Sequence, residues 1–169
     1  MNESLFFFLN DFAGQSRFFD FVFIFSARYL IYIIVIAALF FIFKAQEKRR
    51  RLFIVVFGGA ALAFVISQAL NSLYPVARPF LALPGVNLLF EHGDYDSFPS
   101  GHATVAFAIA TAVFFYNKDL GRILALGALL VGLSRVVVGV HWPLDILGGL
   151  ILGGAVAAVL RAWRGGRYS

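Results

Sequence analysis

Long apolar segments separated by short charged joints constrain this chain more than any other feature. Five such segments occur, at residues 19–43, 52–73, 101–116, 120–138 and 143–162. A helix needs about 20 apolar residues to cross the roughly 30 Å hydrocarbon core of a bilayer. Hydrophobic residues make up 61% of the sequence and charged residues 14%, whereas soluble domains have about 45–50% and about 25%. The pattern predicts an all-α integral membrane helical bundle.

The spans predict one membrane-embedded domain over residues 1–169, with about five to six helices. Five of these are transmembrane. The segment 101–116 is short for a full crossing, so we expect its outer end to lie inside the protein. Residues 1–18 mix Phe with polar residues, and we expect them to form a short helix lying in the membrane interface. These residues lack the basic start of a cleavable secretory signal. The chain as a whole has no cysteine, which excludes thiol and disulfide chemistry.

The positions of Lys and Arg predict the orientation of the bundle, because cytoplasmic loops of membrane proteins are enriched in both. With five spans, three basic segments fall on one face, which we expect to be cytoplasmic. Ten of the 14 basic residues lie there: Lys44, Lys48, Arg49, Arg50, Arg51, Lys118, Arg122, Arg161, Arg164 and Arg167. Membrane topology therefore explains the net charge of +5 without a nucleic-acid partner. The remaining arginines are Arg17, Arg28, Arg78 and Arg135.

Small residues recur in two of the predicted spans, as "FGGAALA" and "LGGLILGGAVAA". Patterns of small residues allow membrane helices to approach one another closely. We interpret these glycines as helix-packing residues rather than as part of a site.

Polar and ionisable residues from three separate parts of the chain fall at the outer ends of spans two to five. Such residues are rare at membrane depth and usually face one another or a polar cavity. The set can bind an anion and move a proton, because arginine forks match phosphate oxygens and histidine transfers protons near neutral pH. Its members are Asn71, Arg78, Ser100, His102, Ser134, Arg135, His141 and Asp145.

Two local features sharpen this prediction. Ser100 and Gly101 precede a helix, whose N-terminus is a ready anion site. Pro143 is expected to open the last helix, so that Asp145 can reach back four residues to the imidazole of His141 and fix its tautomer.

Each residue also has an ordinary interpretation. Ser100 can be a plain helix N-cap, Arg78 can extend to lipid head groups, and Asp145 suits the dipole of a first helical turn. His92 has no partner at a telling spacing and is interpreted as a polar loop residue. The convergence of three segments favours the site.

The motifs at these positions resemble those of the type 2 phosphatidic acid phosphatase (PAP2) superfamily. They are RP at 78–79, PSGH at 99–102 and SRVVVGVHWPLD at 134–145, against the family patterns K-x6-RP, PSGH and SR-x5-H-x3-D. The second and third patterns match in full. The Lys of the first falls on Asn71, and we hypothesise that Arg28 or Arg17 supplies the missing cation.

The resemblance implies a PAP2/haloperoxidase-like core and a phosphatase that uses neither metal nor other cofactor. It implies that His141 attacks phosphorus, that Asp145 orients it and that His102 protonates the leaving oxygen. The phosphate is expected to bind Arg78, Ser100, Gly101, Arg135 and Asn71.

Membrane embedding indicates a lipid phosphate or diphosphate as substrate, with the bilayer as the other partner and no obligatory protein partner. The segments "FFFLNDFAGQSRFFD" and "ARYLIYIIV" are similar to bacterial undecaprenyl-pyrophosphate phosphatases, so undecaprenyl pyrophosphate is the leading substrate. Alternatives are phosphatidylglycerophosphate or phosphatidate, and lipid A. A rival of a different class is a non-catalytic lipid-binding or transport protein. We expect a multi-pass cell-membrane protein with its site on the extracytoplasmic face.

Overall fold

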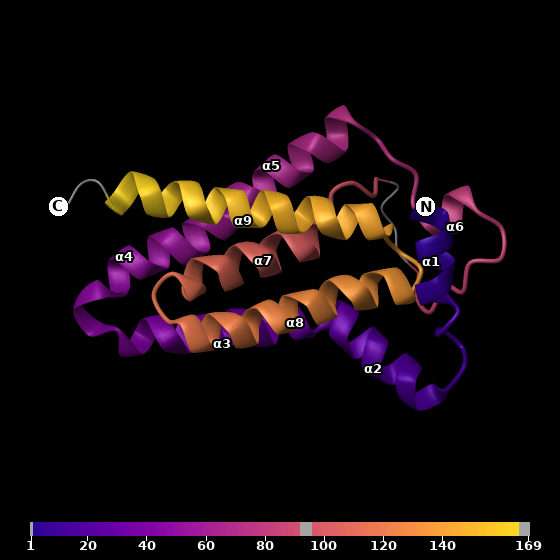
Figure 1. The fold of residues 1–169 in the computed structure, drawn as a ribbon, viewed down its shortest axis with the longest axis horizontal. Coiled ribbons are helices and arrows are strands. Elements are labelled where there is room, and N and C mark those ends of the chain that lie inside the picture. Colours follow the sequence, from indigo (N-terminus) through magenta and orange to yellow (C-terminus); the bar gives the residue numbers. More distant parts are fainter. Residues whose placement is uncertain (1, 92–95, 166–169) are drawn as a thin grey trace.

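The computed structural model of the chain describes residues 2–91 and 96–165. It is an elongated bundle of helices, with the N-terminus at one end and the C-terminus near the other (Figure 1). His92 and Arg167 lie outside the described residues. The elements, in chain order, are α1 (Asn2–Asn10), α2 (Arg17–Arg28), α3 (Leu30–Lys44), the 3-10 turn η1 (Gln46–Lys48), α4 (Arg49–Phe53), the π-helical turn η2 (Ile54–Gly58), α5 (Gly59–Leu73), α6 (Pro79–Ala82), α7 (Gly101–Phe114), α8 (Lys118–Val137) and α9 (Pro143–Gly165).

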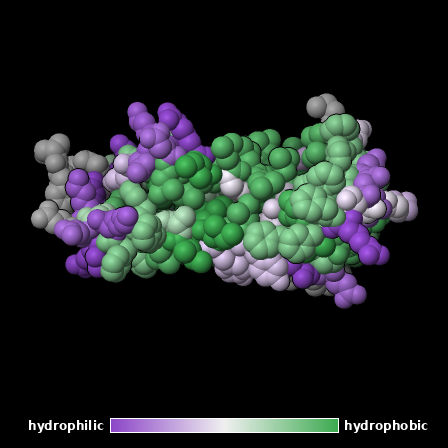
Figure 2. Space-filling model, turned by 90° about the horizontal axis from the view of Figure 1, so that it is seen from below, coloured by the Kyte–Doolittle hydropathy of each residue, from purple (hydrophilic) through white to green (hydrophobic). Residues whose placement is uncertain are grey.

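Among the described residues, three helices can span a membrane by length and composition, or four if the bent pair of α2 and α3 is counted as one span; the sequence predicted five. Arg49–Leu73, Lys118–Val137 and Pro143–Trp163 are each long and apolar enough to cross a membrane. The first predicted span is not one straight helix, because α2 and α3 meet at an angle of 50°. The third predicted span, α7, has 14 residues and therefore a length of about 21 Å. An apolar band covers the middle of the visible face, and polar residues gather at its two ends (Figure 2).

Helix α7 is the centre of the bundle and is buried by its neighbours rather than by lipid. Its alanines are almost wholly covered, and it packs against α9, α8 and α5. A Cβ atom on Gly153 of α9 would lie 2.3 Å from the carbonyl oxygen of Thr104. One on Gly149 would lie 2.9 Å from the amide nitrogen of the same residue. The helix-packing interpretation of these glycines is confirmed, and the short α7 is held by close backbone contact.

Helix α1 docks on the end of the bundle that carries the three motifs. Phe6 is fully buried, with its ring centroid 5.3 Å from that of Trp142. The amide nitrogen of the buried Asn10 side chain donates to the carbonyl oxygens of Asn87 and Val137, at 2.9 and 2.8 Å. The predicted N-terminal helix therefore exists, and one of its faces is bound to protein.

Candidate active site

The turn between α8 and α9 places His141. Gly139 has a positive φ of +89°, a conformation that glycine adopts without steric cost. The chain then folds back, so that the amides of Val140 and His141 both donate to the carbonyl oxygen of Arg135 at 3.2 Å. Helix α9 begins at Pro143, as the sequence predicted. The backbone thus fixes His141 beside the last turn of α8.

His141 and Asp145 are hydrogen-bonded in the buried interior of this end. Nδ1 of His141 lies 3.2 Å from Oδ2 of Asp145, and the two residues are 3% and 2% exposed. The Trp142 amide donates to the same carboxylate oxygen at 2.8 Å. Trp142 directly precedes the helix, so Asp145 occupies the position of the acidic residue in a capping box. The four-residue spacing therefore produces the predicted contact, and the carboxylate caps the helix at the same time.

Ser97 is a third member of this cluster that the sequence analysis missed. Its side chain is fully buried, and its hydroxyl donates to Oδ2 of Asp145. The same hydroxyl oxygen lies 3.3 Å from Nδ1 of His141. No spacing rule links residue 97 to 141. The available signal was a serine two residues before the Pro99 of the second motif.

Arg78 contacts the other nitrogen of the same imidazole. Its Nη1 atom donates to Nε2 of His141 at 3.1 Å and to the carbonyl oxygen of Val140 at 2.7 Å. A permanently charged guanidinium only donates hydrogen bonds, so Nε2 carries a lone pair and Nδ1 carries the proton. A carboxylate that accepts from Nδ1 favours the same tautomer. The geometry presents Nε2 as a nucleophile beside a fixed cation.

His102 and Arg135 line a separate hollow of about 350 Å³ at this end of the bundle. Arg28 lines it too, with its guanidinium 4.0 Å from the centroid of the Phe90 ring. Its remaining lining residues are Tyr29, Tyr32, Phe90 and Glu91. Since the carbonyl oxygen of Arg135 holds the His141 amide, Arg135 joins this hollow to the buried cluster. Of the two arginines proposed to replace the missing lysine, Arg28 lines the same hollow as His102. Arg17 lies at the other end of α2, about 16 Å from Arg28 along the helix.

Ser100 stands at the N-cap position of α7, but its side chain makes no capping hydrogen bond. Its hydroxyl is buried and has no hydrogen-bond partner within the described residues, and the same holds for Ser134. The Ser100 amide donates to the carbonyl oxygen of Asp145 at 3.1 Å, which ties the second motif to the third. Leaving a buried hydroxyl unsatisfied costs about 1–3 kcal/mol, so a ligand that bonds these hydroxyls gains that free energy.

The α-carbon of Gly101 packs against α5, the helix that carries Asn71. A Cβ atom on Gly101 would lie 3.3 Å from the Phe64 ring and 3.8 Å from Oε1 of Gln68. The side chain of Asn71 lies 3.5 Å from the same oxygen. Within the described residues, no recorded contact joins Asn71 to Arg78 or His141. The structure brings Arg78, His141 and Asp145 together, and it leaves Asn71 outside that cluster.

Comparison with known proteins agrees with this arrangement. The PAP2 superfamily profile matches residues 51–169. The bacitracin transport permease protein BcrC of Bacillus licheniformis is 31% identical over 100% of this chain and 83% of its own length. The undecaprenyl-diphosphatase BcrC of Bacillus subtilis is 42% identical over 52% of this chain, which spans 45% of that relative. The crystal structure of Aquifex aeolicus LpxE superimposes with a TM-score of 0.79 at 31% identity, covering 95% of this chain and 94% of that one.

The described residues form a helical bundle with helices apolar enough to span a membrane, and it encloses a buried histidine–carboxylate pair. The chain belongs to the PAP2 superfamily. It is a lipid phosphatase of that superfamily, similar to undecaprenyl-diphosphatases.

Proposed function

We propose that the chain removes the terminal phosphate of undecaprenyl diphosphate through a phospho-histidine intermediate, without a metal ion. The observation that carries this proposal is the imidazole of His141, held between the Asp145 carboxylate at Nδ1 and the Arg78 guanidinium at Nε2. The printed name of the Bacillus subtilis relative supports the choice of lipid.

In the first step, the lone pair on Nε2 of His141 attacks the terminal phosphorus. The phosphorus–oxygen bond to undecaprenyl phosphate breaks, and His102 gives its proton to the leaving oxygen. Asp145 stabilises the imidazolium that forms, as the acidic member of a catalytic triad does. Phosphate oxygens replace the imidazole as acceptors of Arg78, and Arg135 binds them from the neighbouring hollow. Stabilisation of developing charge by fixed donors is usually the largest catalytic contribution.

In the second step, water attacks the phosphorus of the intermediate. His102, now neutral, takes a proton from that water, and the phosphorus–nitrogen bond breaks. Inorganic phosphate leaves and His141 recovers its lone pair. The Ser100 hydroxyl, buried and without a partner among the described residues, donates to a phosphoryl oxygen in both steps, together with the Gly101 amide. Asn71 is proposed as an outer, weaker contact.

The rival is a non-catalytic lipid-binding or transport protein, and the name of the Bacillus licheniformis relative describes transport. The buried relay of Ser97, Asp145 and His141 favours catalysis, because anion binding needs neither an oriented lone pair nor a carboxylate behind it. Other lipids, namely phosphatidylglycerophosphate, phosphatidate and lipid A, are alternative substrates for the same chemistry.

The test is phosphate release by purified protein in detergent with EDTA present, on a panel of these four lipid classes. We expect undecaprenyl diphosphate to give the highest kcat/KM. His141→Ala abolishes release and His102→Ala strongly reduces it, whereas His92→Ala, which lies outside the three motifs, retains it. Equal release by all three variants would exclude the mechanism, and a metal requirement revealed by EDTA would exclude the metal-independent route.

We also propose that the site end faces the extracytoplasmic side, because nine basic residues within the described part of the chain lie at the opposite end, after α3, around the start of α8 and in the last turns of α9. The chain has no cysteine, so single substitutions report sidedness. In intact cells, a membrane-impermeant thiol reagent should label Ser72→Cys and spare Lys48→Cys; the reverse pattern would overturn the orientation.

A further inference from the structure

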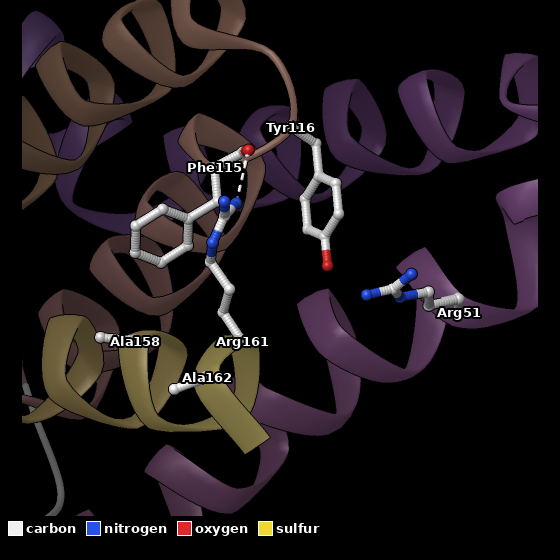
Figure 3. A pocket seen from close by; sticks show the side chains of 6 residues that line it. All are labelled: Arg51, Phe115, Tyr116, Ala158, Arg161 and Ala162. Carbon is white, nitrogen blue, oxygen red and sulfur yellow. Dashed lines mark hydrogen bonds between the residues drawn. The ribbon is translucent and has the colours of Figure 1, made fainter. Parts of the chain in front are cut away.

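A second hollow of about 490 Å³ lies at the end of the bundle opposite to His141, where the start of α4, the turn after α7 and the last turns of α9 meet (Figure 3). We call it the Arg51–Arg161 pocket. Its lining residues are Arg51, Phe115, Tyr116, Ala158, Arg161 and Ala162. Arg161 lies sixteen positions after Asp145 in α9, which corresponds to about 24 Å along the helix. The pocket is therefore distinct from the active site.

Arg161 is held in a fixed position on one wall. Its Nη1 atom donates to the carbonyl oxygen of Phe115 at 2.6 Å. Its guanidinium carbon lies 4.7 Å from the centroid of the Phe115 ring and 5.7 Å from that of Tyr116. A guanidinium has five N–H groups, and within the described residues the structure records a hydrogen bond for one of them. The remaining N–H groups form a pre-positioned donor set.

Arg51 enters the same hollow from another element. Figure 3 shows its guanidinium on the far side of Tyr116 from Arg161, with the Tyr116 hydroxyl directed toward it. The six described lining residues thus include two arginines, one phenol and no carboxylate. Two forked cations with a hydroxyl between them match the oxygens of a phosphate group.

The helices that form the pocket also carry exposed apolar side chains. Phe53 and Val159, on two of the helices that form it, are 50% and 65% exposed, and Trp163 is 54% exposed. Exposed tryptophan is typical of the boundary between head groups and acyl chains. Lipid chains can lie along these side chains while the head group occupies the hollow. The distance of about 24 Å from Asp145 is close to the thickness of the hydrocarbon core, which places the pocket at the opposite membrane surface.

We propose that the Arg51–Arg161 pocket binds the phosphodiester group of an anionic phospholipid, through the two guanidinium groups and the Tyr116 hydroxyl. Basic pockets between transmembrane helices bind phospholipid head groups in this way. The pocket is a lipid site separate from the one that holds the substrate.

The experiment titrates full-length protein in neutral detergent with phosphatidylglycerol. Binding is followed by the thermal unfolding midpoint and by native mass spectrometry, which counts retained lipids. Phosphatidylcholine and inorganic phosphate form separate arms. We expect phosphatidylglycerol to bind and the other two to bind at least tenfold more weakly. Arg51→Gln should weaken binding by about tenfold, because it removes charge-assisted hydrogen bonds to one phosphate.

Two further variants make the result decisive. Arg50→Gln is the matched control, because it removes the same charge from the adjacent, exposed position that does not line the pocket. It should change the affinity by about fivefold or less, as a general surface charge does. Tyr116→Phe keeps the ring against Arg161 and removes only the hydroxyl, so we expect the affinity for phosphatidylglycerol to fall by about threefold to tenfold. If Arg51→Gln does not fold, Tyr116→Phe tests the proposal in its place. Equal losses in Arg50→Gln and Arg51→Gln, no loss in Tyr116→Phe, or equal binding of inorganic phosphate would overturn the proposal.

Discussion

Removing the hydroxyl of Ser97 tests whether the buried relay orients His141. The hydroxyl donates to Oδ2 of Asp145 and lies 3.3 Å from Nδ1 of His141, so Ser97→Ala leaves that carboxylate oxygen with two donors. They are the Trp142 amide at 2.8 Å and Nδ1 itself at 3.2 Å. A hydrogen bond to a charged group contributes about 1.5–3 kcal/mol. If that energy appears in the transition state, where the imidazole becomes charged, kcat falls by about tenfold to 150-fold.

The assay is steady-state phosphate release from undecaprenyl diphosphate in detergent, with kcat and KM determined separately. Because Ser97 touches the relay and not the substrate, we expect kcat to fall and KM to change less than twofold. Ser72→Ala is the matched control, since the exposed Ser72 hydroxyl donates to the carbonyl oxygen of Gln68 within α5, away from the relay. Ser97→Thr restores a hydroxyl and should recover part of the rate.

Two results would refute this reasoning. One is a normal kcat in Ser97→Ala with a lowered unfolding midpoint, which would make Ser97 a purely structural residue. The other is an increase in KM at unchanged kcat, which would mean that the hydroxyl contacts substrate rather than the relay.

Three further predictions follow from particular contacts. His102→Ala should reduce kcat more on phosphatidate than on undecaprenyl diphosphate. The alkoxide that leaves phosphatidate needs a proton, whereas the phosphate that leaves undecaprenyl diphosphate is a weaker base. An equal loss of kcat on both substrates would contradict the role of His102 as the general acid. Arg28→Ala should raise KM by about tenfold while Arg17→Ala leaves it unchanged, and normal turnover and affinity in Arg28→Ala would remove Arg28 as the replacement for the missing lysine. Gly153→Ala should lower stability by about 1–3 kcal/mol in thermal unfolding, because its Cβ would meet the Thr104 carbonyl at 2.3 Å. Gly154→Ala, whose Cβ meets only the Thr111 hydroxyl at 3.8 Å, should be neutral or stabilising, and equal losses for the two glycines would contradict the packing account.

The sequence predicted the parts of the fold that depend on local pattern. Apolar length located α8 and α9 within a few residues, and the glycines of α9 indicated close packing before a partner was known. It did not predict the bend between α2 and α3, because no Gly or Pro stands at Tyr29 to mark a break. The bend depends on how these helices meet α8 and α7, which is tertiary information.

The site also contains residues that the sequence could predict and residues that it could not. The contact between His141 and Asp145 could be predicted, because both residues lie on one helix start where spacing determines direction. Ser97 could not, since its place in the relay depends on where the loop before α7 lies against α9. Asn71 was predicted as a site residue from its place in the first motif, but its recorded contact is with Gln68 and not with the cluster around His141.

The identity of the phosphorylated residue tests the central claim most directly. Full-length protein would be mixed with undecaprenyl diphosphate labelled in its terminal phosphate, quenched within milliseconds into alkali, where phospho-histidine survives, and mapped by mass spectrometry. The mechanism predicts label on His141, none in His141→Ala, and normal labelling in His92→Ala. Label on His102, or turnover with no phosphorylated histidine at any quench time, would contradict it.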